Sequence, residues 1–265
     1  MIIIGEKLNT SIDEVGKAVQ DSDIDAIEQI ALSQVKAGAD YIDVNCGTFV
    51  DREPELLKWM VTVLGECTHK PLCIDSPNPQ AIGAALKVYG GHKPIINSIT
   101  GQKRRYDSIL PLVLEYGTSV IALCMDDDGI PGSADARVSV AERLVENLTN
   151  DGVDFEDIFI DPLVQPMAMD QTNGLTTLRT IEGIKKSLPG IKTLCGLSNI
   201  SFGLPDRSSI NKAFLVLAIH KGLDAAILDP LDRGIVSLSY AAKLMGGQDE
   251  YCLNYLESIK SLKEE

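Results

Sequence analysis

The sequence predicts a closed (β/α)8 barrel, or TIM barrel, in one domain spanning residues 1–265. Two observations lead to this fold class. Short apolar segments recur roughly every 20 to 40 residues and alternate with helix-like stretches, which is the pattern of βα units around a parallel sheet. Eight such segments occur, and eight βα units in about 250 residues is the size of a TIM barrel.

Each expected strand is a short apolar segment that runs into polar residues. The eight strands are expected at residues 2–5, 41–45, 71–75, 94–97, 119–123, 158–161, 192–196 and 225–228. No low-complexity linker or break in composition interrupts the series, so one domain is the simplest organisation.

Amphipathic helices are expected between these strands. In residues 24–37, Ile27 and Ile30 recur at helical spacing with Asp and Glu between them, and Gly38 follows as a helix end. We expect a last helix at residues 250–262 to cover one end of the barrel. The other helices are expected at residues 55–64, 80–89, 107–116, 138–148, 178–188, 212–220 and 235–244.

Charge and hydropathy narrow the classes of protein. The net charge of −14 argues against nucleic-acid binding, which depends on cationic surface, and against docking on anionic lipid. No apolar run approaches the ~20 residues of a membrane helix. The first residues lack the basic region and long apolar stretch of a signal peptide, so we expect a cytoplasmic protein without membrane or nucleic-acid partners.

Metal binding and disulfides are not expected. The six cysteines form no CxxC pair and are interpreted as reduced, mostly buried thiols. The histidines, at positions 69, 92 and 220, complete no zinc spacing. Asp43, Asp75 and Asp161 could bind a hard cation through oxygen, but the neighbouring polar groups are amides, and we expect no metal.

Polar residues gather where the expected strands end. The strand ends carry Glu6, Asp43, Asn45, Asp75, Asn97, Asp126, Asp161, Asn199 and Asp229. One Asp after a strand is commonly a helix cap, but repetition over most strands marks the mouth where TIM-barrel active sites lie. Carboxylates and carboxamides cannot all satisfy one another, so a ligand rich in N–H groups is expected there.

The segment 194–207 joins a strand end, a polar loop and a helix start. Active sites are built at such junctions in parallel α/β proteins. Asn199 stands in this loop with a side chain that donates and accepts hydrogen bonds without carrying charge. A Ser-Asn pair is also typical of a turn or a helix cap.

At these residues the chain resembles the pterin-binding methyltransferases, in particular the methyltetrahydrofolate:corrinoid methyltransferases, which include the folate module of cobalamin-dependent methionine synthase. The resemblance covers essentially the whole chain. It is carried by Ile3-Ile4-Gly5-Glu6, Ile42-Asp43-Val44-Asn45, Asp75-Ser76, Ile96-Asn97-Ser98, Asp161-Pro162 and Gly196-Leu197-Ser198-Asn199 followed by Arg207.

The resemblance implies a methyltransferase that moves a methyl group between N5 of methyltetrahydrofolate and the cobalt of a corrinoid (cobalamin), in either direction. Asn199 is the implied catalytic residue, through a hydrogen bond to N5. The chain contains no Asp-x-His-x-x-Gly, so the corrinoid is expected on a separate protein, and a homodimer is implied. The implied substrate-binding residues are Glu6, Asp43, Asp75, Asn97, Asp161, Gly196, Ser198, Asn199, Phe202 and Arg207.

Three alternatives stay open at this stage. A dihydropteroate synthase-like enzyme is the first, although Asn45-Cys46-Gly47-Thr48-Phe49 stands where that family has a Ser/Thr-Arg-Pro-Gly loop. The second is a non-catalytic pterin- or purine-binding protein. The third is an aldolase-type enzyme with a Schiff base on Lys7, for which an ion pair with Glu6 is the other expected role.

Overall fold

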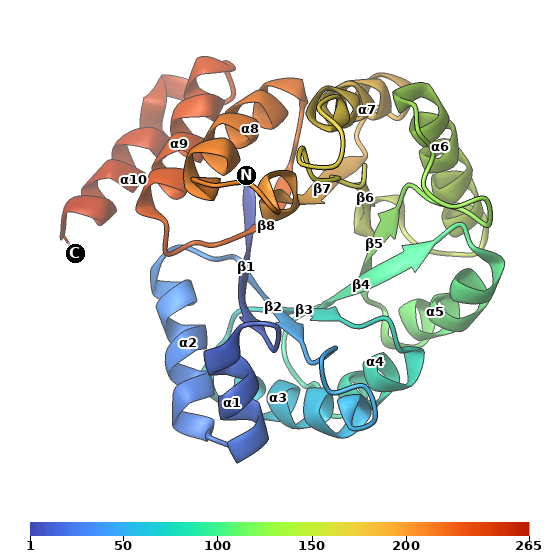
Figure 1. The fold of residues 1–265 in the computed structure, drawn as a ribbon, viewed down its shortest axis with the longest axis vertical. Helices are drawn as coiled ribbons and strands as arrows, with labels where there is room; N and C mark the ends of the chain where they lie inside the picture. The colour runs from blue at the N-terminus through green and yellow to red at the C-terminus, as the bar shows by residue number, and fades with distance from the viewer. Residues whose placement is uncertain (265) are drawn as a thin grey trace.

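The eight predicted strands close into one barrel. In the computed structural model, which describes residues 1–264 and the side chains of residues 1–260, each strand pairs in parallel with its neighbours in sequence order, and β1 closes on β8 (Figure 1). The strands are β1 (Ile2–Asn9), β2 (Tyr41–Asn45), β3 (Leu72–Asp75), β4 (Ile95–Thr100), β5 (Ser119–Leu123), β6 (Ile158–Asp161), β7 (Lys192–Gly196) and β8 (Ala225–Leu228). The predicted (β/α)8 fold is confirmed.

Helices form a ring outside the barrel (Figure 1). They are α1 (Asp13–Asp21), α2 (Ile24–Lys36), α3 (Glu53–Cys67), α4 (Pro79–Leu86), α5 (Lys103–Tyr116), α6 (Ala134–Asn150), α7 (Asn173–Ser187), α8 (Arg207–Lys221), α9 (Arg233–Met245) and α10 (Leu253–Glu264). Short 3-10 turns occur at η1 (Phe155–Asp157), η2 (Leu197–Ser201) and η3 (Glu250–Cys252). No helix in residues 1–264 has the length and apolar character needed to cross a bilayer.

Two helices differ from the expectation. Helix α1 was not predicted, because the nine residues bury only Val15, Ala18 and Val19 and the preceding Ile12 provides no side-chain cap. The tail helix exists but packs against α9 in the outer ring (Figure 1). The expectation that it covers a barrel end was therefore wrong: its neighbour in space is its neighbour in sequence.

Strands β1 and β4 run further than their apolar segments. Their pairing continues to Asn9 and Thr100 across register shifts, which lie between Gly5 and Leu8 in β1 and beside Asn97 in β4. The Asn97–Ser98 peptide bond is cis. Bulges of this kind re-aim side chains next to binding sites, and both lie at the carboxyl end of the barrel.

The barrel interior is packed with apolar side chains from the first part of most strands. One buried cluster draws on seven strands and consists of Ile4, Cys73, Ile95, Ile121, Phe159, Leu194 and Ala225. The outward-facing strand residues pack with the helices in a second, larger cluster. The interior cluster, here called the apolar plug, fills the barrel at the amino ends of the strands. The carboxyl end is therefore the side at which a ligand can enter the barrel.

Candidate active site

A polar layer lies directly above the apolar plug. Because side chains alternate along a strand, the residue two positions later faces the same interior. This step leads from Ile4 to Glu6, Cys73 to Asp75, Ile95 to Asn97, Phe159 to Asp161 and Leu194 to Gly196. The structure thus brings the polar residues predicted at the strand ends to one face of the barrel.

Asp75 is flanked by amides on both neighbouring strands. The strand register sets it opposite Asn45 on one side and Asn97 on the other. The Asn45 Nδ2 donates to Asp75 Oδ2 at 2.8 Å. Burial raises the pKa of Asp75 to about 6, although the Asn45 hydrogen bond and the Arg105 charge act in the opposite direction. The Asn45 amide thus orients the Asp75 carboxylate. The sequence analysis assigned no binding role to Asn45.

Asp43 lies deeper, with a relative exposure of 3%. Its Oδ1 is buried without a hydrogen-bond partner among the described residues. Burial raises the pKa of Asp43 well above its ordinary value, and the charge of Asp75 raises it further. A buried oxygen without a partner costs free energy, so a ligand with N–H or O–H groups is favoured beside it.

Asp161 heads a turn that is held by a buried arginine. Its Oδ1 accepts a hydrogen bond from the backbone N–H of Leu163 at 2.7 Å, and Leu163 has a φ of 62°. Burial raises the pKa of Asp161 to about 7, while the Leu163 N–H and the charge of Arg137 act to lower it. At pH 7 this carboxyl group is therefore about half protonated.

The loop after β7 is hydrogen-bonded to β1, past the one intervening strand, β8. Ser198 Oγ donates to Glu6 Oε1 at 2.7 Å. Burial raises the pKa of Glu6, and this hydrogen bond acts against the increase. Arg207 donates from Nη2 to the Ser198 carbonyl at 2.7 Å and from Nε to Ser201 Oγ at 3.0 Å. Arg207 therefore holds the loop, and the ring of the exposed Phe202 lies 6.0 Å from its guanidinium.

Asn199 presents a free amide in this loop. It is exposed, and its side chain makes no hydrogen bond to the described side chains, those of residues 1–260. A Cβ atom at Gly196 would lie 3.0 Å from Asn199 Nδ2, so glycine leaves the amide its present position. The amide can donate to or accept from a ligand above the barrel.

Lys7 pairs with Asp229 rather than with Glu6. Its Nζ lies 3.1 Å from Asp229 Oδ2, so the expected Lys7–Glu6 pair was wrong. The Glu6 side chain faces the barrel interior and accepts from Ser198. The register shift after Gly5 directs the Lys7 side chain to Asp229, which follows β8. An ion-paired ammonium is a poor nucleophile, which weakens the Schiff-base interpretation.

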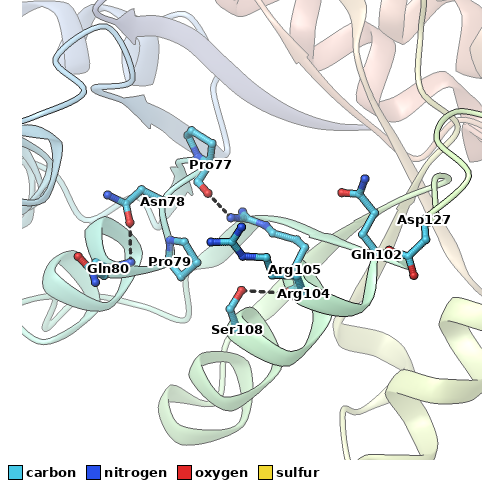
Figure 2. Close-up of a pocket in the computed structure, with 9 residues that line it drawn as sticks. All are labelled: Pro77, Asn78, Pro79, Gln80, Gln102, Arg104, Arg105, Ser108 and Asp127. Carbon is cyan, nitrogen blue, oxygen red and sulfur yellow. Dashed lines mark hydrogen bonds between the residues drawn. The ribbon is translucent and has the colours of Figure 1, made fainter.

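A cavity of about 650 Å³ adjoins the mouth between the first turns of α4 and α5. Figure 2 shows Arg105 directed at the carbonyl of Pro77. The same guanidinium donates to the carbonyls of Ser98 and Ser76 at 2.8 Å each. The cavity is lined by Pro77, Asn78, Pro79, Gln80, Gln102, Arg104, Arg105, Ser108 and Asp127.

Arg105 and Arg137 were both missed from the sequence. Each lies in the first turn of a helix that follows a barrel loop, and each bonds to loop carbonyls. An arginine in the first turn of a helix that follows a barrel strand is the signal that could have found them.

The mouth as a whole suits a planar ligand with N–H donors. Asp75, Asn97 and Asp161 supply acceptors on adjacent parts of the barrel, and the Asn199 amide stands free in the β7 loop. No group of three or more His, Cys, Asp or Glu side chains arranged for a metal ion occurs in the described part of the chain. Acceptors therefore lie in the mouth, and a neutral group that can donate or accept lies in the β7 loop.

Residues 5–229 match the family described as "Pterin binding enzyme". The chain therefore belongs to the pterin-binding enzymes. The Methylcorrinoid:tetrahydrofolate methyltransferase of Eubacterium limosum is 36% identical over 99% of this chain and 97% of that protein. The methionine synthase of Mycobacterium tuberculosis is 33% identical, and the match covers 86% of this chain but only 20% of that longer protein.

Solved structures of the same fold include dihydropteroate synthases. The enzyme of Yersinia pestis in a sulfonamide complex superposes with a TM-score of 0.71 over 92% of this chain and 93% of its own, at 15% identity. At this identity the likeness demonstrates the barrel fold alone.

Proposed function

We propose that the protein transfers a methyl group between N5 of methyltetrahydrofolate and the cobalt of a corrinoid carried by a separate protein. Support comes from the Asn199 amide, which is exposed in the loop after β7 and makes no side-chain hydrogen bond within residues 1–260. The name of the Eubacterium limosum relative supports both substrates and, for that relative, the direction from corrinoid to folate. The reaction is reversible in principle, and this chain can serve either direction.

The pterin would lie in the mouth with its N–H groups toward the buried acids. Asp75 and Asp161 would accept from the ring N–H and amino groups, and Asn97 would add its amide. Asp43, with its unpartnered Oδ1, would form the floor below them. Glu6 and Ser198, joined by their hydrogen bond, would line the side toward the β7 loop.

Asn199 would act at the reacting nitrogen. When the N5–methyl bond breaks toward the corrinoid, the methyl leaves without the bonding electron pair, which stays on N5. The nitrogen then needs a proton to leave as a neutral amine. Asn199 Nδ2 would donate a hydrogen bond to N5 that strengthens as the charge develops. A carboxamide cannot give up a net proton, so water or a nearby carboxyl group would relay it.

The corrinoid supplies the cobalt that accepts or returns the methyl group. This chain would hold N5 toward the open mouth, where a carrier protein can approach. Phe202, with 66% of its surface exposed, would border that approach. We also propose a homodimer and a cytoplasmic location, to be tested by sedimentation velocity and by cell fractionation.

Single-turnover mixing tests the reaction. The protein is mixed with methyltetrahydrofolate and free Co(I) cobalamin while the Co(I) absorbance is followed. We expect Co(I) to disappear as methylcobalamin forms. Pterin binding by calorimetry, with no transfer to either free or carrier-bound corrinoid, would instead indicate a non-catalytic binding protein. No pterin binding would refute the proposal.

An Asn199→Ala variant tests the assigned role. Transfer should slow by about 10²-fold or more, the scale for losing one preorganised donor, while pterin binding is partly kept. Asn147→Ala is the matched control, because Asn147 is an exposed asparagine on the outer face of α6. Equal transfer rates for Asn199→Ala and the parent protein would remove Asn199 from the mechanism.

A further inference from the structure

We propose that Arg137 is a positioning residue for Asp161, holding the turn in place and favouring the ionised carboxylate that the pterin would meet. Arg137 lies on α6, and its side chain is buried, with a relative exposure of 1% for the residue. It touches no proposed ligand position. The ligand in this inference rests on the proposed function, whereas the effect on Asp161 does not.

The guanidinium binds the turn through neutral acceptors. Nη1 donates to the carbonyls of Pro162 and Leu163 at 2.9 and 2.8 Å. Nη2 donates to Gln165 Oε1 and Nε to the Pro131 carbonyl, both at 2.9 Å. Four of the five N–H groups of an arginine are thereby used.

The same turn sets the carboxylate. Leu163, whose carbonyl accepts from Arg137, donates its own N–H to Asp161 Oδ1 at 2.7 Å. The Pro162 carbonyl, which also accepts from Arg137, and the Leu163 N–H belong to one peptide unit, so movement of that unit moves the carboxylate oxygen. Leu163 holds a φ of 62°, which is uncommon for a residue other than glycine and needs support from its surroundings.

The charge of Arg137 is not neutralised by a bonded carboxylate. All four acceptors are carbonyl or amide oxygens. The groups that face Asp161 from the packed elements are Arg137 on α6, Cys124 after β5 and Cys195 on β7. Burial raises the pKa of both thiols, so they are neutral near pH 7, and Arg137 is the charged group that acts on Asp161 within the described residues.

The two possible roles of Arg137 lead to different predictions. If Arg137 only fixes the loop through its hydrogen bonds, its loss weakens pterin binding equally at every pH. A positioning charge also holds the proton off Asp161, and its loss moves the titration of that carboxyl upward. Asp161 has a pKa of about 7, so the difference is visible in the accessible pH range.

The experiment follows the Asp161 carboxyl carbon by NMR in the protein without ligand, assigned with Asp161→Asn. In Arg137→Met the titration midpoint should rise by about one unit, the low end of the effect of an opposite charge, because the charge of Arg137 acts to lower the pKa of Asp161. Arg137→Lys keeps the charge and should titrate close to the parent protein. Arg143→Met is the matched control, because Arg143 lies on the same helix and pairs with Asp126 at 2.7 Å.

Calorimetry with methyltetrahydrofolate supplies the second readout. A midpoint one unit higher lowers the ionised fraction at pH 7 from about a half to about a tenth, so affinity should fall about fivefold at pH 7 and recover near pH 9. An unchanged NMR midpoint in Arg137→Met would overturn the proposal. If Arg137→Met does not fold, Arg137→Gln is measured in its place. If neither variant folds while Arg137→Lys does, Arg137 has a structural role only and the proposal is overturned. Absence of pterin binding by the parent protein would refute the proposed function and leave the NMR result valid.

Discussion

Asp161→Asn should make the protein more stable at alkaline pH. Burial raises the pKa of Asp161 to about 7, against about 3.9 in an unfolded chain. A difference of about three units corresponds to roughly 4 kcal/mol of penalty for the ionised form. Contact with solvent at the open mouth reduces this to about 2 to 4 kcal/mol. Asparagine keeps an Oδ1 acceptor for the Leu163 N–H, so the turn is preserved.

The sign and the pH window follow from linkage. A carboxyl group whose pKa is raised by folding contributes its stability when protonated, and that stability is lost as the pH rises from about 4 through about 7. The gain in the free energy of unfolding of Asp161→Asn over the parent protein should therefore be near zero below pH 4 and reach its full value above pH 8. Between pH 5 and pH 8.5 it should grow by about 1 to 3 kcal/mol.

Urea unfolding at pH 5 and pH 8.5 measures the effect. Asp51→Asn is the matched control, because Asp51 is exposed in the loop after β2, and its substitution should change the free energy of unfolding by less than about 0.5 kcal/mol. The reasoning fails if Asp161→Asn is no more stable than the parent protein at pH 8.5. It also fails if the difference does not vary with pH.

Three further substitutions test the packing around the site and the approach to it. Gly196→Ala places a Cβ atom 3.0 Å from Asn199 Nδ2, and stopped-flow mixing should show about tenfold slower transfer from the displaced amide with an unchanged urea midpoint. Gly5→Ala places a Cβ atom 2.4 Å from Oε1 of the buried Gln34, and urea unfolding should show a loss of about 2 kcal/mol or more. A stable Gly5→Ala would contradict the packing of β1 on α2. Phe202→Ala should leave the free energy of unfolding unchanged, since the ring is 66% exposed, and slow transfer to a carrier-bound corrinoid; an unchanged rate would exclude Phe202 from that approach.

Much of the fold was accessible from the sequence because its signals are local. An apolar segment that ends in Asp-Ser or Asn-Ser predicts a strand and its carboxyl end without knowledge of the partners. Six of the eight strands have their predicted carboxyl ends, and the exceptions, β1 and β4, carry the register shifts. The alternation of side chains then carries Asp75 and Asn97 to the interior face above the plug.

The tertiary structure decided which side chains pair with one another at the mouth of the barrel. Glu6 and Ser198 are 192 positions apart, and Lys7 and Asp229 are 222 apart. No local pattern distinguishes these pairs from the Lys7–Glu6 pair that adjacency favoured. Closure of β1 on β8 brings the first and last strands together, and the shift after Gly5 then directs the two side chains to different partners.

The proton affinities of the mouth also depend on the assembled barrel. The residue types alone predicted a cluster of acids, but an isolated aspartate titrates near pH 3.9. Burial beside the apolar plug raises the pKa of Asp75 to about 6 and of Asp161 to about 7, and arginines from α5 and α6 oppose the increase. The sequence by itself determined which side chains gather at the mouth, through strand period and strand ends. Only the folded barrel decided their partners and charges, because desolvation and long-range contacts arise when the strands close.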